Sequence, residues 1–224
     1  MASDSADHRR ANARRPHRGD LRRALVEAAL RLLDERGVEA VTVRELARRL
    51  GVSHAAPAHH FPDKLALLAA VAAEGYRRFA ASLSAAVQDP SLPGQRLSRI
   101  GMAYLTFALE HPSTFRVMFG RELADRSLQF EELGQASRAA HAVLEEAVTD
   151  AVGVPSPLHA MAAWSLVHGA AMLYLDGPLR SWLPEEDPRG AFERAMSAIL
   201  SGRAGPPAKR SGARARARRG RRRP

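Results

Sequence analysis

Two helix-start signals lie close together in this chain, at Thr42 and at Ser53, with a glycine between them. The run Thr42-Val43-Arg44-Glu45 matches a capping box, in which the threonine hydroxyl accepts a backbone N–H and the glutamate folds back on the cap residue. Gly51 tolerates positive φ and therefore suits the end of this first helix after about two turns. Ser53 is a fresh N-cap for a second short helix. Two short helices joined by so tight a turn predict a helix-turn-helix.

Longer helices are predicted on both sides of this unit. From Asp20, a candidate N-cap, apolar residues recur every three or four positions as far as Gly37, which predicts one helix. The helix that starts at the second cap runs to about residue 60, because the residue before Pro62 avoids the α region. Asp63 can cap a further helix that reaches about Val87.

The rest of the chain is divided into helical stretches by Gly- and Pro-containing breakers. Residues 158–175 are apolar almost all round and approach the roughly 20 residues of a bilayer span, but His159, Ser165 and His168 interrupt them. We expect this helix to be buried in the core or against a second subunit, and not to insert in a membrane. A last amphipathic helix near Pro188–Leu200 also suits a packing surface. Together these two helices predict a homodimer.

The expected fold class is all-α, because the chain shows no alternating strand pattern and no internal repeat. We expect an N-terminal three-helix helix-turn-helix domain over residues 20–66 and a C-terminal helical domain over residues 67–202. Residues 1–19 and 203–224 cannot bury enough apolar area to offset the entropy of ordering. They are predicted to be a disordered basic arm and a disordered Arg-rich tail.

The net charge of +10 is concentrated at the two ends of the chain. Residues 1–23 hold seven Arg and three Asp, and residues 203–224 hold nine Arg and one Lys with no acidic residue, so the stretch between them is net acidic. Such arms suit nonspecific attraction to phosphate polymers through the release of counterions. The alternative is a tail that only improves solubility.

Several classes of protein are excluded. The chain has no cysteine, which fits a reducing compartment, and its first residues lack the apolar core of a signal peptide, so we expect a cytoplasmic protein. It carries no His-Glu-x-x-His motif, Walker-type glycine loop or Gly-x-Ser-x-Gly elbow. His59 and His60 are adjacent, so their side chains diverge on a helix and make a poor metal pair. No catalytic residue, cofactor or metal is expected.

The run from Arg44 to Lys64, RELARRLGVSHAAPAHHFPDK, resembles the DNA-binding signature of the TetR family of transcriptional regulators. The resemblance extends over residues 21–68 and includes the capping box, the turn glycine, the second N-cap and the Phe-Pro-Asp-Lys run in the family's order. It implies that residues 53–61 are a recognition helix that enters the major groove of double-stranded operator DNA. It also implies a C-terminal domain that binds a small effector and forms a homodimer.

The candidate DNA contacts lie on and around this recognition helix, because side chains near the N-terminus of such a helix reach base edges. The candidate base readers are His54, Ala55, Ala56 and His59, although both alanines could instead pack against the preceding helix. Lys64 opposes the macrodipole at its position, and a phosphate contact would explain it. The further candidate contacts are Thr42, Arg44, Ser53 and His60.

Two residues depart from the common family pattern. Ala58 stands where a tyrosine usually serves DNA contact, and Pro57 stands where a leucine is usual. Proline lacks a backbone N–H, which the first helical turn tolerates. We therefore expect contact strength to rest more on the histidines and the arginine arms.

The C-terminal half resembles a TetR branch that is named for a Trp-His-Gly motif, here Trp164, His168 and Gly169, together with residues 111–120. Trp164 and His168 share a helix face and could line an apolar effector pocket with one polar anchor. The candidate pocket residues are Phe107, Phe115, Met118, Phe119, Trp164, His168 and Met172. The alternative is that they form ordinary core. Gly169 is expected to permit close helix packing, in a four-helix interface between two copies.

The predicted function is a TetR-like repressor that a small effector releases from a palindromic operator. The alternative is an architectural or nonspecific nucleic-acid-binding protein driven by its Arg-rich arms. A sequence preference separates the two, because nonspecific phosphate binding is typically orders of magnitude weaker than operator binding.

Overall fold

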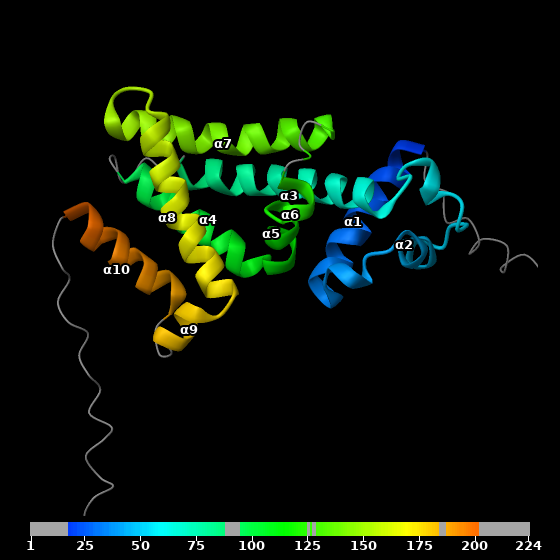
Figure 1. Ribbon diagram of the computed structural model, residues 1–224. Coiled ribbons are helices and arrows are strands. Elements are labelled where there is room, and N and C mark those ends of the chain that lie inside the picture. The colour runs from blue at the N-terminus through cyan, green and yellow to red at the C-terminus, as the bar shows by residue number, and fades with distance from the viewer. Residues whose placement is uncertain (1–17, 88–94, 125, 127–128, 184–186, 202–224) are drawn as a thin grey trace, which may run out of the picture. The chain divides into compact units, whose positions relative to one another are not determined.

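A computed structural model describes residues 18–87, 95–124, 126, 129–183 and 187–201 (Figure 1). The predicted basic arm, except for residues 18 and 19, and the predicted tail lie outside the described residues. All regular structure in the described part is helical, which confirms the expected all-α fold. By its contacts the chain divides into two units, residues 1–185 and 186–224. The second unit contributes one described helix, α10 (Pro188–Ser201).

The first unit holds nine α-helices and two 3-10 turns among the residues described. The N-terminal part consists of α1 (Arg18–Arg36), η1 (Val38–Ala40), α2 (Val43–Leu50) and η2 (Pro57–His59). The remaining helices are α3 (Lys64–Val87), α4 (Arg96–Glu110), α5 (Pro112–Met118), α6 (Arg121–Ala124), α7 (Glu131–Val152), α8 (Pro157–Leu175) and α9 (Pro178–Trp182). Helix α1 begins before Asp20, so this residue lies inside the helix and is not its N-cap.

The caps of α2 agree with the sequence prediction in part. The Thr42 hydroxyl accepts the backbone N–H of Glu45 at 3.2 Å, and Gly51 ends the helix with φ 64° in the left-handed region. The glutamate does not complete the capping box. Its carboxylate accepts hydrogen bonds from Arg48 and Arg49 instead, and these two guanidiniums lower its pKa to about 2.

The predicted recognition helix is shorter than the sequence suggested. Only η2 is helical between the second cap and Pro62, and it is a single 3-10 turn. Pro57 explains the difference, because in an α-helix its N–H would bond the carbonyl of Ser53 and proline has no N–H. That carbonyl accepts the N–H of Ala56 at 3.1 Å instead, in the tighter pattern of a 3-10 turn.

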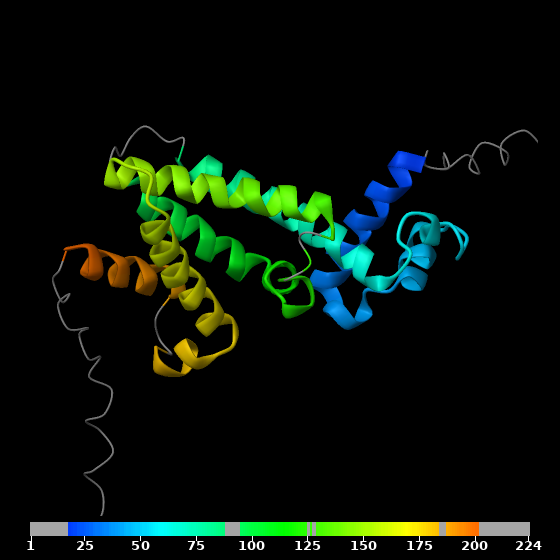
Figure 2. The same cartoon turned by 45° about the horizontal axis from the view of Figure 1, so that its top comes forward.

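Helix α3 is the centre of the first unit, and α1, α4, α5 and α7 pack on it. Figures 1 and 2 show α3 and α7 running side by side. Asp63 caps α3 by accepting the N–H of Ala66 at 2.7 Å, and the helix reaches Val87 as predicted. Five consecutive residues, 69–73, are all buried, because neighbours contact α3 from several sides and small alanines let them approach.

Helix α8 is less buried than its composition suggested. Its inner face, with Ala160, Val167, Ala171 and Tyr174, is buried in the first unit. Its other face remains exposed, and only 22% of its most apolar stretch is buried. By length and composition alone α8 could cross a membrane. The sequence prediction of burial in the core therefore holds for one face of this helix.

Candidate functional sites

The predicted DNA-contact residues lie around the turn between α2 and α3. Thr42, Arg44, Ser53, His54, Ala55, His59 and Lys64 are exposed, whereas Ala56 and His60 are partly buried. The exposure of Ala55 favours the reader role over packing against α2, and that role stays a prediction. Phe61 is 3% exposed, and the guanidinium of Arg22 lies 5.5 Å from the centre of its ring. It therefore belongs to the core.

Lys64 occupies the first position of α3, as the sequence indicated, and its ammonium lies 3.7 Å from the Glu39 carboxylate. Both side chains are exposed, so this ion pair contributes little to stability. The ammonium thus remains available to a phosphate, and the role of Lys64 in DNA contact stays a prediction.

Salt bridges connect the helix-turn-helix region to the rest of the first unit. Glu132 at the start of α7 accepts hydrogen bonds from Arg22 on α1 and from Arg77 on α3. Burial acts to raise the pKa of Glu132, but the two guanidiniums outweigh burial and lower it. Arg78 on α3 makes a similar bond to Glu27 on α1, at 2.7 Å. These bridges join α1 to α3 and α7, so they help to set the orientation of α1 relative to the rest of the first unit.

The Trp164 and His168 side chains meet Tyr104, a residue that the sequence reasoning did not select. The Tyr104 hydroxyl lies 2.8 Å from Nδ1 of His168 and accepts the indole N–H of Trp164 at 3.2 Å. Burial raises the pKa of the Tyr104 hydroxyl and lowers the pKa of His168. At neutral pH the tyrosine therefore keeps its proton and can donate it to a neutral imidazole.

Aromatic rings surround this hydrogen-bonded group. Phe119 contacts His168 with ring centres 4.8 Å apart, and Phe115 and Phe79 pack around Tyr104. Phe107 lies against Phe79 at 5.1 Å, and the Met118 carbonyl accepts the Tyr76 hydroxyl at 3.1 Å. Met172, on the same helix as Trp164, is partly buried, and no ring contact or hydrogen bond connects its side chain to the cluster.

The aromatic cluster is closely packed. The free space between Tyr104, Phe119 and Trp164 is about 10 Å³, which holds about one water molecule. Most of the predicted pocket residues thus lie in one cluster. In the conformation described, this cluster is packed like ordinary core and leaves no room for an effector. Their role in effector binding stays a prediction that requires the cluster to open.

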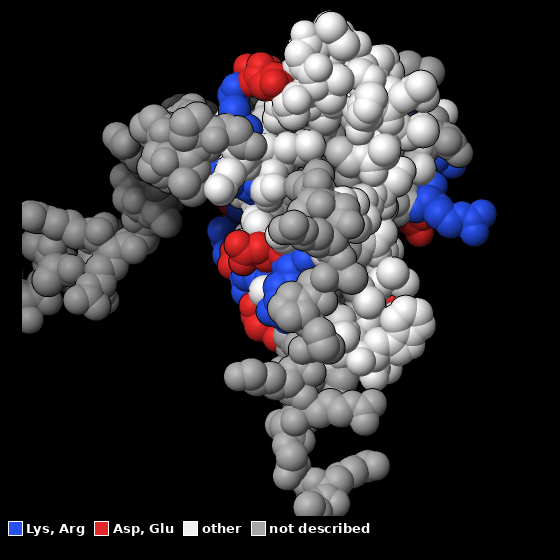
Figure 3. Space-filling view, turned by 90° about the vertical axis from the view of Figure 1, so that its left-hand side faces the viewer, with Lys and Arg blue, Asp and Glu red and all other residues white. Residues whose placement is uncertain are grey.

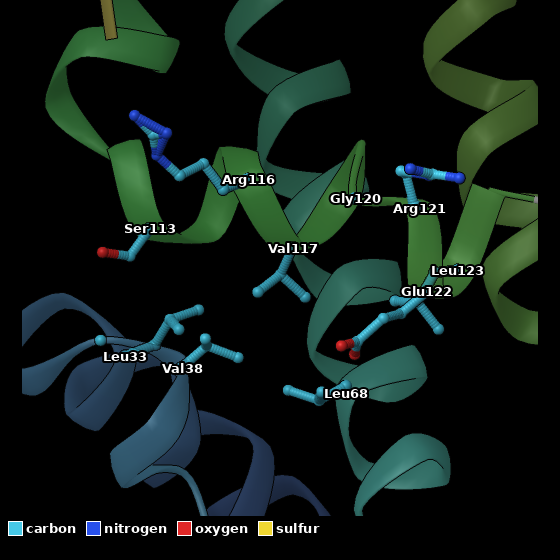
Figure 4. A pocket seen from close by; sticks show the side chains of 11 residues that line it. Leu33, Val38, Leu68, Ser113, Arg116, Val117, Gly120, Arg121, Glu122 and Leu123 are labelled. Carbon is cyan, nitrogen blue, oxygen red and sulfur yellow. The ribbon is translucent and has the colours of Figure 1, made fainter. Parts of the chain in front are cut away.

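A cavity of about 490 Å³ lies elsewhere, between α1–η1 and α5–α6 (Figure 4). Leu33, Val38 and Leu68 line it from the N-terminal side, and Ser113 and Val117 line it from α5. None of the predicted pocket residues borders it. Sequence reasoning missed it because its walls come from separate segments, each of which has the ordinary pattern of a helix or turn.

The exposed face of α8 is mostly apolar, with Ser165 as an exposed polar residue on it. Leu158, Met161, Leu166 and Leu173 are 73%, 57%, 38% and 45% exposed, at spacings that place them on one side of the helix. A Cβ added to Gly169 on the same helix would meet no atom within 4 Å. Helix α8 contains no Lys, Arg, Asp or Glu. White surface, which marks residues other than these four types, predominates in the view of Figure 3.

No group of three or more His, Asp or Glu side chains is arranged to hold a metal ion within the described part of the chain.

Two family models match this chain. The model described as bacterial regulatory proteins of the tetR family matches residues 25–71, and a tetracyclin repressor-like C-terminal domain matches residues 97–199. The second match includes Trp164, His168 and Gly169. The regulator BetI of Brucella canis is 35% identical over 79 residues, which are 35% of this chain. The matched part spans 40% of BetI's own length.

Solved structures share the fold over most of the chain. A Rhodococcus sp. RHA1 protein of unknown function is 31% identical, with a TM-score of 0.71, over 85% of this chain and 99% of its own. AibR, solved in complex with isovaleryl coenzyme A and operator DNA, is 22% identical with a TM-score of 0.55. This alignment covers 80% of this chain and 97% of AibR, and at that identity it supports the fold alone.

Proposed function

Because this chain belongs to the TetR family of bacterial regulatory proteins, we propose that it is a repressor that a small effector releases from a palindromic operator. A DNA-binding regulator needs no catalytic centre, which agrees with the absence of catalytic motifs from the sequence. Its site of action would be the cytoplasm, where bacterial operator DNA lies.

The observation that carries this proposal is the set of exposed polar and cationic side chains from the start of α2 to the start of α3. The cap residues Thr42 and Ser53, the base-reader candidates His54 and His59, and the cation Lys64 are all exposed on one short segment. Polar and cationic side chains of this kind can contact phosphates and base edges. One of them, His59, lies on the 3-10 turn η2, which stands in place of a full recognition helix.

The apolar face of α8 supports a homodimer. Leu158, Met161 and Leu173 are too exposed for a monomeric core, and a second copy that packs on them would remove this surface from water. The open space at Gly169 lets a partner helix approach closely. Dimerisation places two recognition segments at related DNA half-sites, which fits a palindrome.

An effector that enters the cluster of Trp164, Tyr104 and His168 has to separate packed rings. Such a ligand favours an open conformation and can lower operator affinity only by binding one conformation more tightly than the other. AibR, which shares this fold, was solved in complex with isovaleryl coenzyme A and operator DNA, so the fold can hold both kinds of ligand.

The test is selection of a randomised duplex library by the purified full-length chain at about physiological salt, in parallel with a variant that ends at Gly202. Enrichment of one palindrome by both proteins supports a site-specific repressor to which the Arg-rich tail is accessory. If no sequence is enriched and the truncated variant no longer binds DNA, the chain is a nonspecific, arm-driven nucleic-acid binder and the proposal is wrong.

A further inference from the structure

The cavity between α1–η1 and α5–α6 has the size and lining of a ligand site. Its volume of about 490 Å³ falls within the roughly 300–1,000 Å³ that is usual for small-molecule pockets. Buried leucines form much of its wall, namely Leu33, Leu68 and Leu123. Val38 and Val117 add further apolar surface from the two facing segments.

The charge that faces this cavity is negative. Figure 4 shows the Glu122 carboxylate turned toward Val117 and Leu68, into the cavity. No hydrogen bond or ion pair to Glu122 is found among the residues that the structure describes. An unpaired carboxylate beside apolar walls would gain a charge-assisted hydrogen bond from a cation.

The two arginines of the lining do not supply the opposite charge inside the cavity. The Arg116 guanidinium donates to the Asp176 carboxylate at 2.9 Å and to the Leu175 carbonyl at 2.8 Å, at the end of α8. Figure 4 shows that the side chains of Arg116 and Arg121 both turn away from the space that Glu122 faces.

We propose that this cavity is a second ligand site and that it binds an amphipathic monocation, a small molecule with an apolar body and one ammonium or amidinium group. The apolar body packs against Leu33, Val38, Leu68 and Val117, and the cationic group pairs with Glu122. The Ser113 hydroxyl also borders the cavity, at the side away from Glu122 (Figure 4).

The position of this site gives it a regulatory consequence, which rests on the proposed function. One wall belongs to α1 and η1, which lead directly into α2, and the other belongs to α5, which packs on α3. A ligand that prefers one spacing of these walls changes the orientation of the helix-turn-helix. The same ligand then changes DNA affinity, and DNA changes ligand affinity by the same factor.

The site is tested by calorimetry on the full-length chain without DNA at neutral pH, with octylammonium, whose –NH₃⁺ group can donate hydrogen bonds, as the probe and with octanoate and 1-octanol as its anionic and neutral counterparts. The cation should bind more tightly than either. Glu122→Gln should weaken cation binding by roughly five- to tenfold, the loss expected for one partly solvated charge-assisted bond. Glu131→Gln, on α7, is the matched control and should change nothing.

A second variant tests the cavity itself. Val38→Phe fills space without changing charge, and it should reduce binding of both the cation and the alcohol, provided that its melting temperature shows an intact fold. The site is refuted if octanoate binds as tightly as the cation. It is equally refuted if both Glu122→Gln and Val38→Phe leave cation binding unchanged.

The regulatory step has its own readout, which is the affinity for the duplex enriched from the library, measured with and without octylammonium. A changed affinity in the wild type that disappears in Glu122→Gln supports the coupling. An unchanged affinity refutes the coupling and leaves the calorimetric site standing. If the library yields no preferred duplex, the proposed function fails and the calorimetric result is unaffected.

Discussion

The Tyr104 hydroxyl lies 2.8 Å from Nδ1 of His168, and these two residues connect α4 to α8 through the middle of the aromatic cluster. The tyrosine oxygen also accepts the Trp164 indole N–H. One hydroxyl thus satisfies two polar groups in otherwise apolar surroundings. Leaving buried polar groups without partners costs more than the bond itself contributes.

Tyr104→Phe is therefore expected to lower the free energy of unfolding by about 1–2 kcal/mol, measured by denaturant titration. The same substitution in a His168→Phe background should cost clearly less, because one of the two partners is already gone. Equal losses in the two backgrounds would show that the hydroxyl does not act through His168.

The lowered pKa of His168 predicts a pH dependence of stability. Burial holds the folded-state pKa below the ordinary value of 6.5, so the folded chain favours the neutral imidazole. The contribution of the neutral His168 imidazole to the free energy of unfolding is complete above pH 6.5, and it is lost as the pH falls from there through the folded-state pKa. Between pH 7.5 and 5.5 the melting temperature of the wild type should fall more steeply than that of His168→Gln. A steeper fall in the variant would contradict this assignment.

The proposed pairing of Lys64 with a DNA phosphate predicts a particular salt dependence. Lys64→Gln should weaken binding to operator and random duplexes alike, and it should reduce the slope of log affinity against log salt by about 1 for each phosphate that the ammonium neutralises. Arg138→Gln, an equal charge change on the exposed side of α7, is the control and should leave the slope nearly unchanged. If the two variants behave identically, Lys64 acts only through net charge.

The apolar face of α8 predicts the effect of a buried charge at a dimer interface. Met161→Glu should raise the dimer dissociation constant by at least about tenfold, because an unpaired carboxylate would have to be desolvated on association. Analytical ultracentrifugation measures the change, and Ala139→Glu on α7 is the control. A dimer of unchanged stability in Met161→Glu would place the interface elsewhere.

Local signals explain why much of the N-terminal region could be predicted. Thr42, Gly51 and Asp63 each act within a few residues of their own position, and each caps its helix as expected. Glu45 differs because two neighbouring guanidiniums compete for its carboxylate. The capping box therefore fails at the residue that has alternative partners.

Features that depend on distant segments could not be derived in the same way. The cluster residues Trp164 and His168 share a helix face, which sequence spacing predicts, but their partner Tyr104 comes from α4 and carries no local signal. The cavity at Glu122 depends on how α1 and α5 approach one another. Helix α8 is a related case. Its composition shows that it is apolar, but it does not show which face of the helix packs against the rest of the same chain.

The turn η2 gives the last prediction, which concerns Ala58. This residue is exposed and lies between Pro57 and the candidate reader His59. A tyrosine there can donate its hydroxyl to a phosphate, and one neutral hydrogen bond of about 1 kcal/mol corresponds to roughly fivefold in affinity.

Ala58→Tyr should therefore bind the enriched duplex about fivefold more tightly, whereas Ala58→Phe, which lacks the hydroxyl, should not. Fluorescence anisotropy over a range of salt concentrations measures both variants. If affinity and salt slope are unchanged in Ala58→Tyr, the missing phenol causes no deficit, because a segment that Pro57 holds in a 3-10 turn approaches DNA differently from the α-helix of the common family pattern.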